Sequence, residues 1–215
     1  MVVVINRKIL IAWCRLLVFS VLTSYGAVAH SASKVVLVLG DSLSAEYGLA
    51  RGTGWVALLE QRLQQKNIVA TVVNASISGE TTSGGKARID SLLKKYRPDV
   101  IIIELGGNDA LRGLALNASE KNFRDMIAMA NTAKAKVLLV GMQIPPNYGR
   151  DYTEQFFSIY ARVAKTTHST LVPFFMEGVA NRPELFQADR IHLLARAHPA
   201  LLDNVWPHLQ KLLQQ

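Results

Sequence analysis

Short apolar segments recur along the chain at regular intervals. Five of them have the length of a β-strand and are rich in Val, Ile and Leu: 34–39, 68–73, 100–105, 136–140 and 170–175. They lack the apolar–polar alternation of a half-exposed strand, and such runs are typical of strands covered on both faces. Each run therefore predicts a buried strand.

Between these runs, apolar residues recur at helical spacing. The predicted helices span 54–66, 86–96, 120–134, 152–167 and 199–213, and Thr53 is the expected N-cap of the first. Strands that alternate with helices of this length predict βαβ units, in which a parallel sheet carries helices on both faces. We find no internal repeat and no Pro-, Gly- or Ser-rich linker, so we expect a single α/β domain, doubly wound.

The first 29 residues have the features of a secretory signal peptide. Arg7 and Lys8 form a short basic segment, an apolar stretch spans 9–28, and a small-x-small cleavage pattern ends at Ala29. The alternative is an uncleaved membrane anchor, but Arg15 interrupts the apolar stretch, and a charge near the centre of a bilayer is costly. We therefore expect cleavage after residue 29 and a periplasmic or secreted protein.

Cleavage at this point changes the composition. The 215 residues include 24 Lys and Arg, 16 Asp and Glu, and one cysteine. Cys14 and three basic residues belong to the predicted signal peptide, so the formal net charge falls from +8 to +5. The remaining domain, 30–215, has no thiol, which excludes disulfides, thiolate catalysis and cysteine-ligated metals. Its basic residues are not interleaved with aromatic ones, so nucleic-acid binding is not expected.

Four irregular segments follow predicted strands: 74–85, 106–119, 142–151 and 176–192. In open α/β sheets, ligands bind at the carboxyl ends of the strands. We therefore expect these segments and the turn at Gly40 to form one rim that carries the functional site.

Two features of this rim suit acyl transfer. Ser42 follows the first predicted strand in Gly40-Asp41-Ser42-Leu43-Ser44, and a serine on such a turn exposes its hydroxyl as a nucleophile requires. Among five histidines, His192 has Asp189 three residues before it, a spacing that allows the carboxylate to hold the imidazole. Each feature has an ordinary alternative: a turn serine, and a surface ion pair or helix cap. His168 and His208 fit surface positions, and His198 fits a helix start.

Two further residues offer hydrogen-bond donors to a tetrahedral oxyanion, namely the backbone N–H of Gly79 and the side-chain amide of Asn108. The segment 79–87 also resembles a phosphate-binding loop, but it has one residue too many before Lys86, and Ala87 replaces the Ser or Thr that would hold magnesium. No metal-ligand spacing is found either, so neither a cofactor nor a metal is expected.

In order and spacing, these segments resemble the four blocks of the GDSL (SGNH) hydrolase family. The blocks are Gly40-Asp41-Ser42-Leu43-Ser44, the Gly79 loop, Gly107-Asn108-Asp109 and Asp189-x-x-His192, and they span nearly all of the domain. Longer stretches at 74–82, 144–149 and 202–207 resemble the bacterial subgroup known as thioesterase I, lysophospholipase L1 or arylesterase.

The resemblance implies a flavodoxin-like three-layer α/β/α sandwich with a five-stranded parallel sheet. It also implies that Ser42 is the nucleophile, that His192 is the general base and acid, and that Asp189 orients the histidine. The implied oxyanion hole consists of the Ser42 and Gly79 backbone N–H groups and the Asn108 amide. The chain departs from the family pattern at Leu193, where proline is common, and at Arg190, where a small residue is frequent. These departures put the entry to the last helix and the access of substrate in question.

The implied activity is that of a serine esterase acting through an acyl-serine intermediate. Its substrates would be acyl esters or thioesters, such as lysophospholipids, acyl-CoA, or aryl and short- to medium-chain esters. A carbohydrate or cell-wall acetyl esterase with the same residues is an alternative, and so is a non-catalytic lipid carrier, although a carrier has no need of the complete set. We expect a small-molecule substrate, a monomer, and no stable membrane insertion after signal cleavage.

Overall fold

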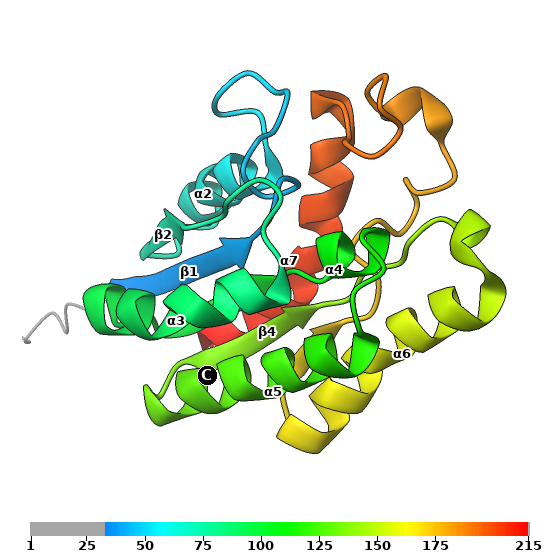
Figure 1. The fold of residues 1–215 in the computed structure, drawn as a ribbon. Coiled ribbons are helices and arrows are strands. Elements are labelled where there is room, and N and C mark those ends of the chain that lie inside the picture. Colours follow the sequence, from blue (N-terminus) through cyan, green and yellow to red (C-terminus); the bar gives the residue numbers. More distant parts are fainter. Residues whose placement is uncertain (1–32, 215) are drawn as a thin grey trace, which may run out of the picture. The chain divides into compact units, whose positions relative to one another are not determined.

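A five-stranded parallel sheet forms the centre of the fold in a computed structural model, which describes residues 33–214 (Figure 1). The strands lie in the order β2-β1-β3-β4-β5. Their bounds are β1 Lys34–Gly40, β2 Ala70–Asn74, β3 Val100–Glu104, β4 Lys136–Val140 and β5 Thr170–Val172. The predicted signal peptide, 1–29, lies outside the described residues.

Helices cover both faces of this sheet. The longer ones are α2 Trp55–Gln65, α3 Thr82–Tyr96, α5 Leu116–Thr132, α6 Arg150–Thr167 and α7 His198–Gln214, and α4 Gly107–Leu111 is a single short turn. Helices α3, α5 and α6 pack side by side on one face, and α2 packs against α7 on the other (Figure 1). The α/β class, the three layers and the flavodoxin-like strand order are therefore confirmed.

Burial on both faces explains the strand pattern in the sequence. Every residue of β3 is buried, and Val36 to Leu39 of β1 are completely buried. The outer strand β2 is only partly buried. Successive side chains of a strand point to opposite faces of the sheet, and here helices cover both faces. Both sets of side chains are therefore buried, which is why the central strands appear in the sequence as apolar segments without alternation.

The strand order places a topological switch point between β1 and β3. The chain leaves β1 for β2 on one side and later returns to pair β3 with the other side of β1, with Val36 opposite Val100. Loops that leave adjacent strands in opposite directions open a crevice at their carboxyl ends. The turn that carries Ser42 and the segment that carries Asn108 both begin there.

Several predicted boundaries are wrong for local reasons. Helix α3 begins at Thr82 rather than at 86, because the Thr81 side chain accepts a hydrogen bond from the Gly84 N–H and caps the first turn. Strand β5 ends at Val172, immediately before Pro173, which has no N–H to donate to a ladder. The segment 106–119, expected to be irregular, contains α4 and the start of α5.

The predicted N-cap of the first helix is also wrong. Gly54, not Thr53, precedes helix α2, and the Thr53 hydroxyl donates to the Ala50 carbonyl instead. The Glu46 carboxylate accepts hydrogen bonds from the Gly52 and Gly54 N–H groups just before the helix. The N–H of Trp55, the first helical residue, donates to His198 Nδ1, so side chains from other parts of the chain hold the start of α2.

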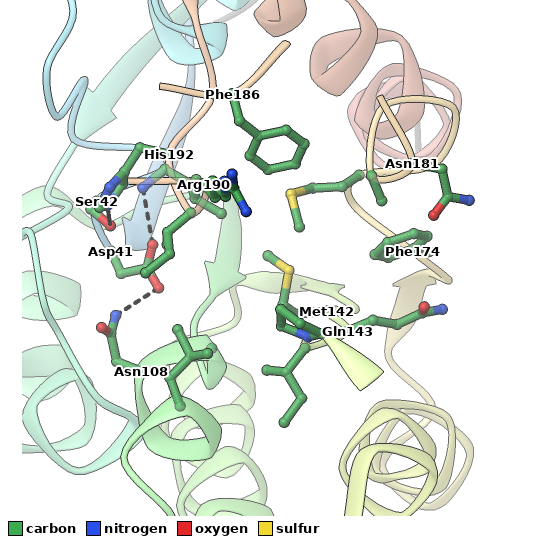
Figure 2. A pocket seen from close by; sticks show the side chains of 18 of the residues that line it. Asp41, Ser42, Asn108, Met142, Gln143, Phe174, Asn181, Phe186, Arg190 and His192 are labelled. Carbon is green, nitrogen blue, oxygen red and sulfur yellow. Dashed lines mark hydrogen bonds between the residues drawn. The ribbon is translucent and has the colours of Figure 1, made fainter. Parts of the chain in front are cut away.

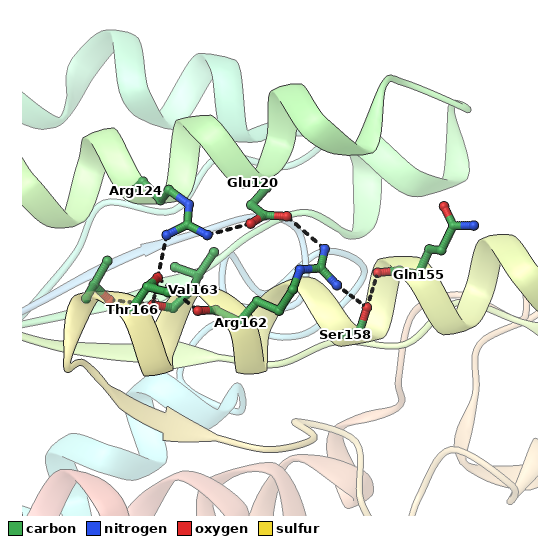
Figure 3. A network of polar contacts seen from close by, with 8 residues as sticks. Glu120, Arg124, Gln155, Ser158, Arg162, Val163 and Thr166 are labelled. Atoms are coloured by element: carbon green, nitrogen blue, oxygen red, sulfur yellow. Dashed lines mark hydrogen bonds and ion pairs between the residues drawn. The ribbon is translucent and has the colours of Figure 1, made fainter.

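Charged side chains join α5 to α6 on the outside of the fold (Figure 3). Glu120 of α5 accepts hydrogen bonds from Arg124 at 2.6 Å and from Arg162 of α6 at 2.7 Å, and Arg124 also donates to Thr166. The Arg162 hydrogen bond, assisted by Arg124, lowers the pKa of Glu120 below its usual value despite partial desolvation. This network ties α5 to α6 in the outer layer of the fold.

Candidate active site

Ser42 lies in a tight turn directly after β1. The carbonyl of Asp41 accepts hydrogen bonds from the N–H groups of Ser44 and Ala45, at 3.2 and 2.9 Å, so the chain reverses within a few residues. This turn leaves the Ser42 side chain half-buried at the edge of a pocket (Figure 2).

His192 and Asp189 complete a hydrogen-bonded chain that starts at this serine. His192 Nε2 lies 2.8 Å from Ser42 Oγ, and His192 Nδ1 lies 2.6 Å from Asp189 Oδ2. Ser42 and His192 lie 150 positions apart along the chain, yet the three residues form one continuous line of hydrogen bonds. The sequence prediction that Asp189 holds the imidazole of His192 agrees with this geometry.

The loop around Asp189 keeps its carboxylate ionised. Desolvation alone would raise the pKa of Asp189, but the N–H and ring of His192 and the N–H of Ile191 outweigh it and lower the pKa to about 2. Both backbone N–H groups lie 3.0 Å from Asp189 Oδ1, which leaves Oδ2 for the imidazole. An ionised carboxylate on Nδ1 fixes the tautomer in which Nε2 is free to accept a proton.

The candidate oxyanion donors surround the same turn. Gly79 has φ +78°, a conformation that side chains rarely adopt, and its carbonyl accepts a hydrogen bond from Arg112 at 2.9 Å. Within residues 33–214, the backbone N–H groups of Ser42 and Gly79 donate to no other protein atom. The Asn108 amide donates to Asp41 Oδ2 and to the Glu80 carbonyl, both at 3.0 Å, and so ties the Ser42 turn to the Gly79 loop.

Two buried carboxyl groups lie beneath the turn, and sequence reasoning missed both. Burial raises the pKa of Asp41 to about 6, against the lowering effects of the Leu43 N–H, the His192 charge and the Asn108 amide. Burial, reinforced by repulsion from Asp41, raises the pKa of Glu104 well above its usual value. Glu104 is the one charged residue in an otherwise apolar strand run, and that contrast was the available signal.

Glu104 organises the underside of the turn. Ser44 Oγ donates to Glu104 Oε2 at 2.7 Å and accepts a hydrogen bond from Trp55 Nε1 at 3.1 Å. The other carboxyl oxygen of Glu104 is buried and has no hydrogen-bond partner among the described residues. A buried carboxyl with one unpaired oxygen favours the neutral, protonated form.

The pocket beside Ser42 has a volume of about 470 Å³, within the range of small-molecule sites (Figure 2). Loops after β1, β3, β4 and β5 and the segment before His192 line it, as the predicted rim required, whereas the Gly79 loop does not contribute to the lining. Most of the lining is apolar and includes Met142, Ile144, Phe174, Met176 and Phe186. Such a surface accommodates a hydrocarbon chain.

The Tyr47 ring covers one side of the His192 imidazole. The ring centroids of Tyr47 and His192 are 4.3 Å apart, the ring planes are tilted by 36°, and Tyr47 is 51% exposed. The adjacent ring restricts rotation of the imidazole and leaves an aromatic surface facing solvent next to the site.

The two residues that depart from the family pattern, Leu193 and Arg190, lie in different surroundings. Leu193 is buried and pairs with Phe186 in a short bridge, so the chain enters the last helix through packed core rather than through a proline. Arg190 lines the pocket with its backbone at φ +58°. His198 begins α7 as predicted, and its Nδ1 also accepts the Trp55 N–H at 3.1 Å in a buried contact.

The phosphate-loop-like segment has a packing explanation. A Cβ at Gly85 would lie 2.5 Å from Leu105 Cδ1, so glycine lets α3 approach the end of β3 closely. The buried Asp109 accepts hydrogen bonds from the N–H and hydroxyl of Thr82, at 2.8 and 2.5 Å, and from Ser119. The carboxylate thus occupies the helix start where a phosphate would bind.

In residues 33–214, no group of three or more His, Cys, Asp or Glu side chains is arranged to hold a metal ion. Over the same residues, no helix combines the length and apolar character needed to cross a bilayer.

Comparison with known proteins gives consistent matches over this domain. Residues 38–200 match the GDSL-like Lipase/Acylhydrolase family. The chain is 49% identical over 184 residues to Esterase TesA of Pseudomonas aeruginosa, covering 86% of this chain and 92% of that protein. It is 41% identical over 200 residues to Thioesterase 1/protease 1/lysophospholipase L1 of Escherichia coli strain K12, covering 93% of each.

The fold agrees with solved structures of similar sequence. A crystal structure of TesA superposes with a TM-score of 0.82 at 49% identity, over 83% of this chain and 99% of that one. The family match spans the turn of Ser42, the Gly79 loop, Asn108 and the Asp189–His192 pair. The chain therefore belongs to the GDSL-like lipase/acylhydrolase family.

Proposed function

We propose that the protein is a serine hydrolase of acyl esters or thioesters that works through an acyl-serine intermediate. The observation that carries the proposal is the line of hydrogen bonds from Ser42 through His192 to Asp189, at 2.8 and 2.6 Å, opening into an apolar pocket. The names of the relatives, esterase and thioesterase/lysophospholipase, support the same chemistry.

The acylation step follows from the geometry. His192 Nε2 accepts the Ser42 proton as Oγ attacks the substrate carbonyl, and a tetrahedral oxyanion forms. The Asp189 carboxylate stabilises the imidazolium and keeps its orientation. When the intermediate collapses, the bond to the leaving oxygen or sulfur breaks, and the imidazolium donates its proton to that atom. The product is an alcohol or thiol, and the acyl group remains on Ser42.

Deacylation repeats the cycle with water as the nucleophile. His192 removes a proton from water, the hydroxide attacks the acyl-serine carbonyl, and a second tetrahedral intermediate forms. Collapse releases the carboxylic acid and returns the proton to Ser42 Oγ. Atoms balance because one water is consumed for each ester or thioester cleaved.

The oxyanion is stabilised by the backbone N–H groups of Ser42 and Gly79, which are free to donate, and by the Asn108 amide. Both hydrogens of that amide already have acceptors, Asp41 and the Glu80 carbonyl, at 3.0 Å. The Asn108 contribution therefore requires that one hydrogen be shared between its present acceptor and the oxyanion. The two backbone donors are the principal ones, since they need no rearrangement.

The pocket favours substrates with a hydrocarbon acyl chain over acetyl esters. A volume of about 470 Å³ is much larger than an acetyl group needs, and its lining is mostly apolar. One observation favours the second candidate, a carbohydrate acetyl esterase: Tyr47 is 51% exposed next to His192 and offers a ring on which a sugar stacks. A non-catalytic lipid carrier would have no use for the hydrogen-bonded triad.

A substrate panel tests the proposal. We expect p-nitrophenyl esters from acetyl to dodecanoyl, lysophosphatidylcholine and acyl-CoA to be hydrolysed with a preference for acyl chains longer than acetyl. Ser42→Ala should abolish activity, whereas the control Ser91→Ala, an exposed serine on α3, should not change it. Activity that survives in Ser42→Ala contradicts the nucleophile assignment, and a sharp preference for acetyl esters supports the second candidate.

We further propose that residues 1–29 are a cleaved secretory signal, that 30–215 form the single hydrolase domain, and that the protein acts as a monomer in the periplasm or outside the cell. The basic segment at Arg7 and Lys8 and the small-x-small pattern ending at Ala29 support this. Mass spectrometry of the protein exported by a bacterial host should show an N-terminus at His30. An intact N-terminus in the membrane fraction contradicts it.

A further inference from the structure

Arg190 is an exposed residue that brings a permanent positive charge to an otherwise largely apolar pocket. It lines the cavity together with Phe186 and His192, and Figure 2 shows its side chain near both. Among residues 33–214, no Lys and no other Arg lines this pocket. A guanidinium is charged at every physiological pH, so any group that enters the cavity meets this charge.

The left-handed backbone of Arg190 belongs to the tight turn between Phe186 and Leu193. Six non-glycine residues in the described chain have positive φ, and four of them, Asn67, Arg97, Lys134 and His168, lie at the carboxyl ends of helices. A left-handed residue is ordinary at a helix end.

The remaining two residues with positive φ, Glu46 and Arg190, differ in what their side chains contact. Glu46 has φ +58°, and its carboxylate holds the Gly52 and Gly54 N–H groups. Arg190 also has φ +58°, but it neither ends a helix nor hydrogen-bonds through its side chain to any residue of the described chain. The left-handed backbone serves the turn, in which the Arg190 N–H donates to the Gln187 carbonyl, and the Arg190 side chain is left without a hydrogen-bond partner among residues 33–214.

The guanidinium is also free of ionic partners. None of the ion pairs within residues 33–214 involves Arg190, although Asp189 is its neighbour, because the Asp189 carboxylate is engaged by His192 and Ile191. Among residues 33–214, one carboxyl group lines the pocket, that of Asp41, and it accepts hydrogen bonds from the Leu43 N–H and the Asn108 amide. The Arg190 donors are therefore available to a ligand.

The loop that carries Arg190 is held firmly in place. The Arg190 N–H donates to the Gln187 carbonyl at 3.0 Å, and the Gln187 N–H donates to the His192 carbonyl at 2.7 Å. The Gln187 side chain donates to the carbonyls of Tyr47 and Leu193, both at 3.0 Å. These bonds fix the backbone from which the Arg190 side chain leaves, two residues from the catalytic imidazole.

We propose that Arg190 is a specificity-determining residue that binds a carboxylate or phosphate group of the substrate close to the scissile ester. The proposal rests on the hydrolase function proposed above and narrows its substrate class to esters that carry an anion. A guanidinium donates two parallel hydrogen bonds to either kind of anion, which gives the contact both strength and a defined geometry.

Two matched substrate pairs separate the possible sources of the anion. On the acyl side, mono-p-nitrophenyl glutarate is compared with p-nitrophenyl valerate, which has the same chain length and no carboxylate. On the alcohol side, 1-lauroyl-glycerol 3-phosphate is compared with 1-lauroyl-glycerol. The measured quantity is the ratio of kcat/KM for the anionic member to that for the neutral member.

Three variants are compared with the unmodified enzyme. Arg190→Gln removes the charge and keeps a side chain at the strained position, and Arg190→Gly removes both the charge and the strain. The control Arg182→Gln removes an equal charge from an exposed arginine that pairs with Glu184 and does not line the pocket. In at least one pair, both Arg190 variants should lower the ratio by roughly tenfold or more, while the control leaves it unchanged.

The outcomes are distinct. The pair in which the ratio falls identifies the acyl or the alcohol side as the source of the anion. A ratio that falls by less than tenfold in both pairs, or that falls equally in Arg182→Gln, overturns the role of Arg190. Hydrolysis of the neutral esters by Ser42→Ala would instead overturn the hydrolase mechanism itself, so the two failures are distinguishable.

Discussion

The buried carboxyl of Glu104 should make folding stability depend on pH in a measurable way. Glu104 is 1% exposed, and burial together with repulsion from Asp41 raises its pKa well above the usual value of 4.5. In the unfolded chain the same carboxyl ionises at its ordinary pKa. The folded protein therefore binds a proton that the unfolded chain releases, and stability falls as pH rises above about 4.5 toward the raised pKa.

Glu104→Gln removes this linked proton, because glutamine stays neutral. Between the unfolded and folded pKa values, the wild type loses about 1.4 kcal/mol of unfolding free energy per pH unit relative to the variant. The difference grows steadily as pH rises while folded Glu104 keeps its proton, and it levels off above the raised pKa. Hydrogen bonds that the glutamine gains or loses change the difference in unfolding free energy by the same amount at every pH, so they do not change its slope with pH.

Urea unfolding at pH 5, 6 and 7, followed by tryptophan fluorescence, measures this difference. Glu60→Gln, an exposed position on α2, is the matched control and should give a difference independent of pH. The slope belongs to Asp41 and Glu104 as an interacting pair, since burial also raises the pKa of Asp41, to about 6. A pH-independent difference for Glu104→Gln would refute the conclusion that the network beneath Ser42 holds an extra proton.

Three further substitutions test separate parts of the site and fold. Asp189→Asn removes the charge that orients the imidazole, so kcat for a p-nitrophenyl ester should fall by roughly 10³- to 10⁴-fold with little change in Tm; a rate within tenfold of the wild type contradicts the role. Arg112→Gln removes the donor that lies 2.9 Å from the Gly79 carbonyl and so loosens the loop that carries the Gly79 N–H. Steady-state kinetics should show kcat lowered by up to roughly 10²-fold while KM changes little. A rise in KM alone would argue against a role of Arg112 in positioning this loop. Gly85→Val places a Cβ 2.5 Å from Leu105 Cδ1 and should lower the free energy of unfolding by about 1–3 kcal/mol, as measured by urea unfolding. An unchanged urea midpoint contradicts the close packing of α3 on the end of β3 at Gly85.

The fold was predictable because the central strands are buried on both faces. The apolar runs at 34–39, 100–105 and 136–140 coincide with β1, β3 and β4 to within a residue. Predictions failed where short-range contacts decide the boundary. The Gly84–Gly85 pair looked like loop sequence, but the Thr81 cap starts α3 before it. Nothing in the pattern distinguished the five-residue helix α4 from a turn.

The candidate site was partly predictable, because its polar residues follow strands whose carboxyl ends meet. Ser42, Asp189 and His192 were identified from local spacing together with the order of the blocks, and the structure connects them by hydrogen bonds. The burial of Glu104 follows from its place in an apolar strand, but its role could not be derived, because its hydrogen-bond partner Ser44 lies 60 positions away along the chain. The Asp41 contact with Asn108 joins positions 67 residues apart, a pairing that a single sequence does not reveal.

Peptide mapping after reaction with an organophosphonate ester shows whether Ser42 is the nucleophile. Such a reagent mimics the tetrahedral intermediate and phosphonylates an activated serine. We expect one adduct, on Ser42, that forms in proportion to the loss of esterase activity and does not form in His192→Ala. Complete inactivation with the adduct on another residue, or full activity with Ser42 phosphonylated, would contradict it.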